Sequence, residues 1–137
     1  MNRRKTELGA FACLVLCAIV GAAEDFQVRS KSGAAVQSAI DLAGASGGGR
    51  VVLTEGVYPS TTLYFRSGVE LHLEKGAVLL GSPRWSDYDD VDDPRIGKVP
   101  ERSKKAFIVA IGCEDVAITG EGTIDGQGVS FYDSNVP

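Results

Sequence analysis

The sequence is poor in cysteine, with three among 137 residues, and two of these, Cys13 and Cys17, lie near its start. It also lacks an apolar run of the roughly 20 residues needed to cross a membrane. Its most apolar stretch, LGAFACLVLCAIV, has 13 residues, so we expect no permanent anchor. Basic residues are outnumbered by acidic ones, 14 to 18, which argues against nucleic acid or an anionic membrane surface as a partner.

The first 23 residues have the layout of a secretory signal peptide. MNRRKTE supplies three basic residues and one acid, the apolar run follows, and small side chains precede Glu24. We place cleavage after Ala23, which predicts a secreted or periplasmic mature chain of residues 24–137. Cys113 is then the only cysteine, so that no internal disulfide can form, and the formal charge moves from −4 to −6.

The mature part begins with one helix and continues as short strands. Residues 33–44, GAAVQSAIDLAG, place apolar side chains at helical spacing, and the glycines that follow stop the helix. After these come seven apolar runs of four to six residues, closed by glycine or polar turns: RVVL, TTLYF, VELHL, AVLL, AFIVAI, VAIT and GTID. Strands this short and closely spaced are typical of an antiparallel sandwich or of a coil of parallel strands.

Internal repetition favours the coil. Residues 62–81, TLYFRSGVELHLEKGAVLLG, and 107–126, FIVAIGCEDVAITGEGTIDG, share one order of strands, turns and glycines. This alignment places Gly76 and Gly122 at equivalent bends, 46 residues or about two turns of 23 apart. The pattern predicts a parallel β-helix with the helix as its N-terminal cap, and a polar loop, residues 82–105, that projects from one corner.

The glycine-rich segment GEGTIDGQG, residues 120–128, is the most distinctive local feature. It lacks the Gly-Lys-Ser or Gly-Lys-Thr of a P-loop, and its glycines do not follow the GxGxxG spacing of dinucleotide-binding proteins. We interpret residues 123–125 as a three-residue strand between glycine corners. Asp125 is then a corner residue and not a catalytic acid.

Several segments together resemble a known family. AVQSAIDLAGASGGGRVVLTEGVY, SGVELHLEKGAVLLGS, a polar loop and VAITGEGTIDGQG, in this order, resemble the N-terminal part of the glycoside hydrolase family 28 enzymes, the polygalacturonases and their relatives. The resemblance extends from about Val28 to Gly128. It implies a right-handed parallel β-helix of the pectin-lyase-like superfamily and a pectic polysaccharide as substrate. It also implies inverting hydrolysis of α-linked galacturonan or rhamnogalacturonan by aspartates in a cleft along the coil.

The catalytic elements that this resemblance implies are missing. Inverting hydrolysis needs two carboxyl groups about 6.5–9.5 Å apart, which the family supplies from Asn-Thr-Asp and Asp-Asp elements, supported by Gly-His-Gly and Arg-x-Lys. No Asn-Thr-Asp or Gly-His-Gly occurs. Asp89-Asp90 and Asp92-Asp93 precede the GTIDGQG corner instead of following it, and Arg95 and Lys98 have the wrong spacing and place. We therefore assign no catalytic residue and no cofactor, and predict that the chain by itself is inactive.

Two acidic clusters allow a metal-binding interpretation. Glu70, His72 and Glu74 share the outer face of one strand, but without a fourth ligand we interpret them as a solvated face. The run DYDDVDD, residues 87–93, lacks the ligand spacing and central glycine of an EF-hand loop and is interpreted as a hydrated loop. The sequence thus predicts no metal site.

The polar loop contains the only candidate sugar contacts, Trp85 and Tyr88. Their rings could stack on a sugar, although folding back onto the coil is the simpler interpretation. Cys113 lies at a turn without neighbours arranged to activate it, so we interpret it as a lone thiol.

Two functions remain open from the sequence. The first is the N-terminal part of a secreted pectin-degrading hydrolase whose catalytic aspartates lie beyond Pro137. About two turns of coil without a second cap would leave the last turn unpaired, which favours this interpretation. The second is a non-enzymatic β-helix segment that binds polysaccharide or stacks into a surface assembly.

Overall fold

The computed structural model describes residues 24–92 and 104–131, so the expected signal peptide lies outside the described residues. Within these ranges the chain forms one α-helix, nine short strands and two short 3-10 helices. In chain order they are β1 (Asp25–Gln27), α1 (Gly33–Ala45), β2 (Gly49–Leu53), β3 (Gly56–Ser60), β4 (Leu63–Tyr64), β5 (Val69–Leu73), β6 (Ala77–Gly81), η1 (Trp85–Asp87), β7 (Ile108–Val109), β8 (Ala117–Gly120), β9 (Thr123–Asp125) and η3 (Gly128–Phe131). None of the helices described is long and apolar enough to cross a membrane.

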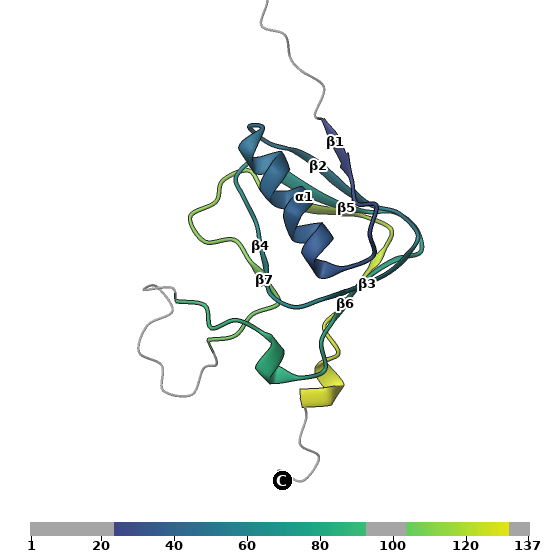
Figure 1. Ribbon diagram of the computed structural model, residues 1–137, viewed down its shortest axis with the longest axis vertical. Helices are drawn as coiled ribbons and strands as arrows, with labels where there is room; N and C mark the ends of the chain where they lie inside the picture. Colours follow the sequence, from purple (N-terminus) through teal and green to yellow (C-terminus); the bar gives the residue numbers. More distant parts are fainter. Residues whose placement is uncertain (1–23, 93–103, 132–137) are drawn as a thin grey trace, which may run out of the picture.

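The strands form three parallel sheets, with the orders β1-β2-β5-β8, β3-β6-β9 and β4-β7. Two circuits of the chain each add one strand to every sheet, first β2, β3 and β4 and then β5, β6 and β7; the last described circuit adds β8 and β9 to the first two sheets (Figure 1). Leu71 of β5 pairs in parallel with Val51 on one side and Ile118 on the other. The predicted parallel arrangement is therefore present, and no hairpin joins VELHL to VAIT.

The register corrects the predicted repeat. Val51 pairs with Leu71, 20 residues later, but Leu71 pairs with Ile118, 47 residues later. The second circuit is longer because the polar loop, residues 82–105, falls inside it. Residues 62–81 and 107–126 are consequently neighbouring circuits and do not lie two turns apart.

The proposed equivalence of Gly76 and Gly122 is wrong by one residue. Val78 pairs with Thr123, which places Gly122 opposite Ala77. Gly76 has a φ of 83°, whereas the left-handed glycine near the start of β9 is Gly120, with a φ of 103°. Matching glycines by type alone missed this shift, because the corner before β9 is built differently from the corner before β6.

The predicted elements differ from the observed ones mainly at their edges. The helix extends over 33–45 instead of 33–44, and TTLYF and AFIVAI shrink to the two-residue strands β4 and β7. The strands β1 (DFQ) and β3 (GVYPS) were not predicted. Their sequences lack an apolar run, and they form because a neighbouring circuit supplies a partner strand.

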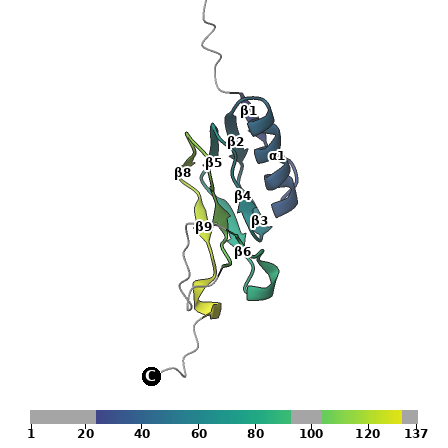
Figure 2. The ribbon, with the colours of Figure 1, turned by 90° about the vertical axis from the view of Figure 1, so that its left-hand side faces the viewer.

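Helix α1 begins at an N-cap, Ser32, whose Oγ accepts a hydrogen bond from the Ala35 N–H at 3.3 Å. The helix buries Val36, Ile40 and Ala43 completely against the core. Figure 2 shows α1 at one end of the stack of circuits, with β8 and β9 at the opposite end.

The core lies between the three sheets and consists of alternate side chains of the strands. In β5 these are Val69, Leu71 and Leu73, all at most 2% exposed. The equivalent side chains of the last circuit are less covered: Ile118, next to Leu71, is 45% exposed and Ile124, next to Leu79, is 39% exposed. The apolar interior is therefore open to solvent at the β8–β9 end.

Candidate functional site

The first part of the polar loop is tied to the corner between β3 and β4. Thr62 Oγ1 donates a hydrogen bond to the Ala106 carbonyl at 2.8 Å and accepts one from the Asp89 N–H at 2.9 Å. Tyr64 Oη donates to Asp89 Oδ2 at 3.1 Å. Thr62 thus contacts the first part of the loop, through Asp89, and also Ala106, the residue that follows the loop.

Trp85 and Tyr88 belong to a cluster of four rings, which we call the aromatic cluster: Trp85, Tyr88, Phe107 and Phe131. Trp85 and Phe131 meet edge-on with ring centroids 5.4 Å apart, and Tyr88 meets Phe107 edge-on at 6.0 Å. Tyr88 is only 6% exposed, and its hydroxyl donates to the Ser82 carbonyl at 2.8 Å. Burial raises the pKa of the Tyr88 phenol.

The two candidate sugar contacts therefore have different surroundings. Tyr88 folds back onto the coil, whereas Trp85 remains 46% exposed beside a cavity of about 100 Å³. Of these two residues, Trp85 is therefore the one that is accessible from solvent. Phe107 and Phe131 were not identified from the sequence, because no local spacing relates residues so far apart in the chain.

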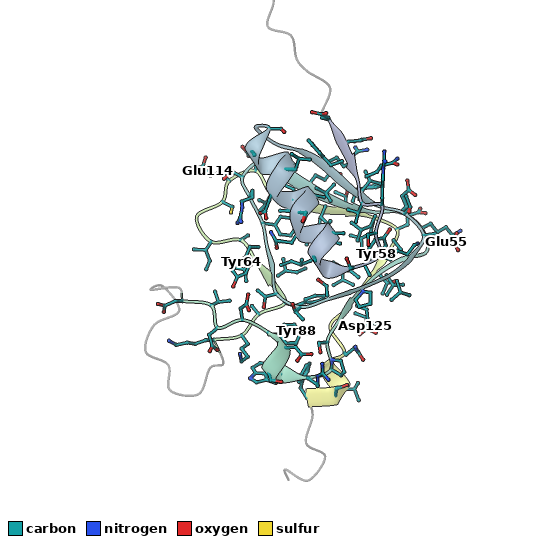
Figure 3. All side chains as sticks on the ribbon, in the orientation of Figure 1. Glu55, Tyr58, Tyr64, Tyr88, Glu114 and Asp125 are labelled. Atoms are coloured by element: carbon teal, nitrogen blue, oxygen red, sulfur yellow. The ribbon has the colours of Figure 1, made fainter. Side chains whose placement is uncertain are left out.

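A larger cavity of about 550 Å³, the corner groove, lies beside the loop. Its walls are the N-terminal part of α1, the corner formed by residues 59–63, residues 80–84 at the end of β6 and just after it, Asp87 and Gln127. Figure 3 shows Tyr88 and Asp125 at this end of the molecule, where the chain leaves β6 and β9. The groove collects hydroxyl, amide and guanidinium groups, which are the groups that bind saccharides and carboxylates.

Within the corner groove the charged pair Arg84 and Asp87 is internally compensated. Asp87 Oδ2 accepts hydrogen bonds from Ser82 Oγ, from Arg84 Nε at 3.1 Å and from Arg84 Nη2 at 2.9 Å. The Ser82 hydroxyl and then the Arg84 guanidinium hold the pKa of Asp87 below its usual value. Asp87 is therefore held by two groups of its own loop, the Ser82 hydroxyl and the Arg84 guanidinium.

The other aspartates of the loop are also engaged. Asp90 pairs with Lys105 at 3.4 Å, and Asp92 pairs with Lys104 at 3.8 Å. These pairs lie where the two ends of the loop meet, at the antiparallel bridge between Asp90 and Lys105. Asp93, Arg95 and Lys98 fall outside the described residues.

Asp125 shapes the corner that follows β9. Its Oδ1 accepts a hydrogen bond from the Gln127 N–H at 2.8 Å, and Gln127 has a left-handed φ of 51°. An aspartate that bonds the backbone two residues later stabilises a turn. The Gln127 side-chain amide in turn donates to the Gly81 carbonyl of the neighbouring circuit.

The histidine and its neighbours form a network on the outer face of the first sheet. Thr119 Oγ1 lies 2.7 Å from His72 Nδ1 and donates to Glu70 Oε1 at 2.6 Å, and Arg50 Nε lies 3.4 Å from Glu70 Oε1. The Thr119 hydroxyl, followed by the Arg50 guanidinium, lowers the pKa of Glu70. In the described part of the chain, no three His, Cys, Asp or Glu side chains are close enough together to hold a metal ion. Glu74 therefore does not form a metal site with Glu70 and His72.

Cys113 lies at a turn on the same circuit as β7. Its Sγ donates to the Phe65 carbonyl at 3.3 Å, and its side chain is partly buried. The thiol thus bonds the backbone of the preceding circuit.

Comparison with known proteins places these features in a family context. No protein-family model matches the chain. The exo-poly-alpha-D-galacturonosidase of Dickeya chrysanthemi is 32% identical over 101 residues, which cover 69% of this chain and 16% of that protein. The chain therefore spans about one sixth of the length of this relative.

Two solved structures are similar as well. The family 28 exopolygalacturonase of Yersinia enterocolitica matches with a TM-score of 0.65 and 29% identity, over 77% of this chain and 21% of that one. An inferred glycosyl hydrolase from Parabacteroides merdae matches with a TM-score of 0.64 and 28% identity, over 78% of this chain and 46% of that one. Over part of their length, the family 28 exopolygalacturonases are similar to this chain in both sequence and structure.

Proposed function

We propose that residues 24–137 are the N-terminal portion of a right-handed parallel β-helix in a secreted pectin-degrading glycoside hydrolase of the polygalacturonase kind. The observation that carries the proposal is the parallel stacking of β2, β5 and β8, together with the partial-length similarity to family 28 exopolygalacturonases. The substrate is then an α-linked galacturonan or rhamnogalacturonan, cleaved with inversion.

In this proposal α1 is the N-terminal cap of the β-helix. Its buried residues Val36, Ile40 and Ala43 join the same apolar cluster as Val51 and Leu53 of the first circuit. A helix in this position covers inward-facing side chains that would otherwise meet water, as terminal repeats of stacked proteins do.

The catalytic carboxyl groups of the proposed enzyme lie beyond residue 137. The described aspartates support this, because Asp87, Asp89, Asp90 and Asp92 bond to hydroxyl or cationic groups of the loop and its neighbours. We expect the pure 137-residue chain to release no reducing ends from polygalacturonate. Saturable turnover by this chain would contradict the proposal. A coding sequence past codon 137 that lacks the Asn-Thr-Asp and Asp-Asp elements would contradict it as well.

Trp85 is the proposed sugar contact of this part of the protein, because its side chain is 46% exposed beside the cavity of about 100 Å³. It is the only tryptophan in the sequence, so its fluorescence reports directly on binding. We expect oligogalacturonate to change this emission in a saturable way. An unchanged spectrum at saturating sugar would leave Trp85 as a purely structural ring.

Export is a separate element of the proposal and rests on the first 23 residues. Expression in a bacterium should yield a product outside the cytoplasm that begins at Glu24. Amino-terminal sequencing of that product is the direct test, and an intact Met1 would contradict it.

One observation favours the alternative function, a non-enzymatic segment that stacks into an assembly. The apolar side chains Ile118 and Ile124 are exposed at the β8–β9 end. Sedimentation at increasing concentration tests for the oligomer, and hydrolysis by a longer form distinguishes the two functions: an ordered, reversible oligomer without hydrolysis by any longer form would favour the assembly.

A further inference from the structure

The strand β4 lies at the end of the stack that carries α1, the α1 end, and its backbone has one edge that no strand occupies (Figure 2). Leu63 and Phe65 donate their N–H groups to carbonyls of the next circuit, each at 2.8 Å. Because successive backbone groups of a strand point to opposite sides, the N–H and the carbonyl of Tyr64 face the other way. Tyr64 therefore presents one donor and one acceptor at the outer edge of β4.

The side-chain amide of Gln37, on α1, bonds both of these groups. Its Oε1 accepts from the Tyr64 N–H at 2.8 Å, and its Nε2 donates to the Tyr64 carbonyl at 2.9 Å. These are the two bonds that a residue of an added antiparallel strand would exchange with Tyr64. The amide of Gln37 thus occupies the place of a neighbouring strand.

The orientation of this amide is fixed by a second contact. Gln37 Nε2 also donates to Asp41 Oδ1 at 3.0 Å, and the same oxygen lies 2.8 Å from Arg66 Nη2. An ionised carboxylate can only accept hydrogen bonds, so the nitrogen of the amide must face Asp41. The oxygen of the amide is then the atom that faces the Tyr64 N–H.

The other two sheets have their own obstacles to strand pairing at the α1 end. In β3, Gly56 donates its N–H to the Gly76 carbonyl of the next circuit at 3.0 Å, so that the nitrogen of Pro59, three residues later, lies on the outer side. A proline nitrogen has no hydrogen to donate to an added strand. The first sheet ends in β1, which has three residues and carries Asp25. Proline, short strands and charged side chains are features that protect sheet edges.

The opposite end of the stack is different. The strands β8 and β9 contain no proline, and their apolar residues Ile118 and Ile124 are 45% and 39% exposed. The two ends of the stack are therefore not equivalent as surfaces for a further strand.

We propose that Gln37 substitutes for a strand residue at the edge of β4 and that, together with Pro59 and the short β1, it closes the α1 end to pairing with another chain. Strands are then added only at the β8–β9 end, whether they come from a further circuit or from a second copy. This closure does not depend on the proposed hydrolase, because it concerns only backbone groups of the first circuit and β1.

Hydrogen exchange of the Tyr64 amide tests the role of Gln37. Gln37→Met keeps an unbranched side chain with similar helix propensity but removes both bonds. The Tyr64 amide should then exchange about tenfold faster, as expected for the loss of one hydrogen bond, whereas the Leu63 and Phe65 amides should keep their rates. An unchanged Tyr64 rate, or equal acceleration at all three amides, would overturn the proposal.

The matched control for this exchange experiment is Ser38→Ala, at the next position of α1. The Ser38 hydroxyl donates to the Ala34 carbonyl of the same helix and makes no bond to β4. The Tyr64 amide should exchange at the native rate in this variant. Acceleration equal to that in Gln37→Met would mean that any change in the helix exposes Tyr64, which would contradict a specific role for Gln37.

Sedimentation of the 137-residue chain tests the closure of the α1 end. Ile118→Lys and Ile124→Lys together block the opposite end, so the chain that carries both should sediment as a monomer. Adding Gln37→Met and Pro59→Val opens the edges of β4 and β3 and should raise the average mass toward that of a dimer. The rise should reverse on dilution, because edge pairing between folded chains is an equilibrium.

Three results of this sedimentation experiment would contradict the closure. Association of the chain with only the two lysines would mean that another surface, the α1 end included, is open in the native protein. A monomer after all four substitutions would mean that the helix closes this end without Gln37 and Pro59. Irreversible aggregation would reflect unfolding and would count against edge pairing.

Discussion

Two glycines of the GTIDGQG segment show how differently the same residue type can be used. At Gly120 the backbone has a φ of 103°, and a Cβ would overlap the Leu73 carbonyl oxygen of the neighbouring circuit. At Gly126 a Cβ would meet nothing within 4 Å. The first glycine is required by close backbone approach and by its left-handed conformation, and the second is not.

We therefore expect Gly120→Ala to lower the free energy of unfolding by about 1–3 kcal/mol or more, because the variant combines a strained φ with a backbone overlap. Gly126→Ala is the matched control and should change it by no more than about 0.5 kcal/mol. Urea denaturation of both variants measures the difference. Similar values for the two would show that the corner before β9 is not tight.

Thr119 gives a residue-scale prediction for pH. Its hydroxyl is the main cause of the lowered pKa of Glu70, whose ordinary value is 4.5. A carboxyl whose pKa is lower in the folded than in the unfolded chain stabilises the fold above about pH 4.5, and this stabilisation is lost as the pH falls through the folded value. Thr119→Val should raise the pKa of Glu70 toward its ordinary value.

The stability difference between Thr119→Val and the native chain should accordingly be largest near neutral pH and shrink in acid. Unfolding curves across this pH range test the direction, and the carboxyl ¹³C shift of Glu70 reports its titration. Thr61→Val, at an exposed position, is the control. A difference that grows in acid would contradict the assigned role of the hydroxyl.

At the scale of elements, the amphipathic spacing of α1 determines which of its aliphatic side chains are buried. Ile40 is fully buried in the core, whereas Leu42, two residues later on the same helix, is 57% exposed. Both are large aliphatic residues whose replacement by alanine does not weaken intrinsic helix propensity, so a truncation at each position separates packing from helix formation.

Ile40→Ala should lower the free energy of unfolding by about 2–5 kcal/mol, through lost burial and the cavity left behind. Leu42→Ala should change it by about 0.5 kcal/mol or less. Thermal and urea unfolding of both variants provide the measurement. Equal losses would mean that α1 does not pack on the first circuit as described.

For the strands, local spacing predicts which face is buried but not which strand is the partner. The spacing of Val69, Leu71 and Leu73 predicts a strand with one buried face, and β5 has that face. The strand β3 carries Pro59 within GVYPS and was not predicted, yet it pairs with β6 along its whole length. Its pairing depends on a partner that lies 21 residues later, since Tyr58 faces Leu79, and a local pattern contains no information about that partner.

At the scale of the whole molecule, the two ends of the stack differ. α1 lies at one end, and at the other Ile118 and Ile124 are in register with the buried residues Leu71 and Leu79 but remain exposed. Exposed apolar side chains beside strand edges are sites of association.

We expect the 137-residue chain to self-associate through this end. The double variant Ile118→Lys and Ile124→Lys should reduce the average mass in sedimentation experiments, because like charges repel and the apolar surface is removed. Val57→Lys replaces an exposed apolar residue of β3, 46% exposed, and should leave association unchanged. Equal loss of association in both would place the contact elsewhere.

The sequence by itself determined the helix, the strands that contain an apolar run, and the buried face of VELHL, but not the strands β1 and β3. Helical spacing over 33–44, alternation in VELHL and glycines at corners act within a few residues, so that they can be recognised without the fold. The resemblance to the polygalacturonases likewise rests on contiguous segments, and the comparisons support it over part of the relatives' length.

Only the tertiary structure decided which segments lie side by side. It placed the polar loop inside one circuit, shifted Gly122 opposite Ala77, and brought Phe107 and Phe131 to Trp85 and Tyr88. It also set the unpaired Ser60 hydroxyl against the start of α1. Each of these depends on the register between circuits that are 20 to 47 residues apart in the chain, which stacking energy selects and local pattern does not encode.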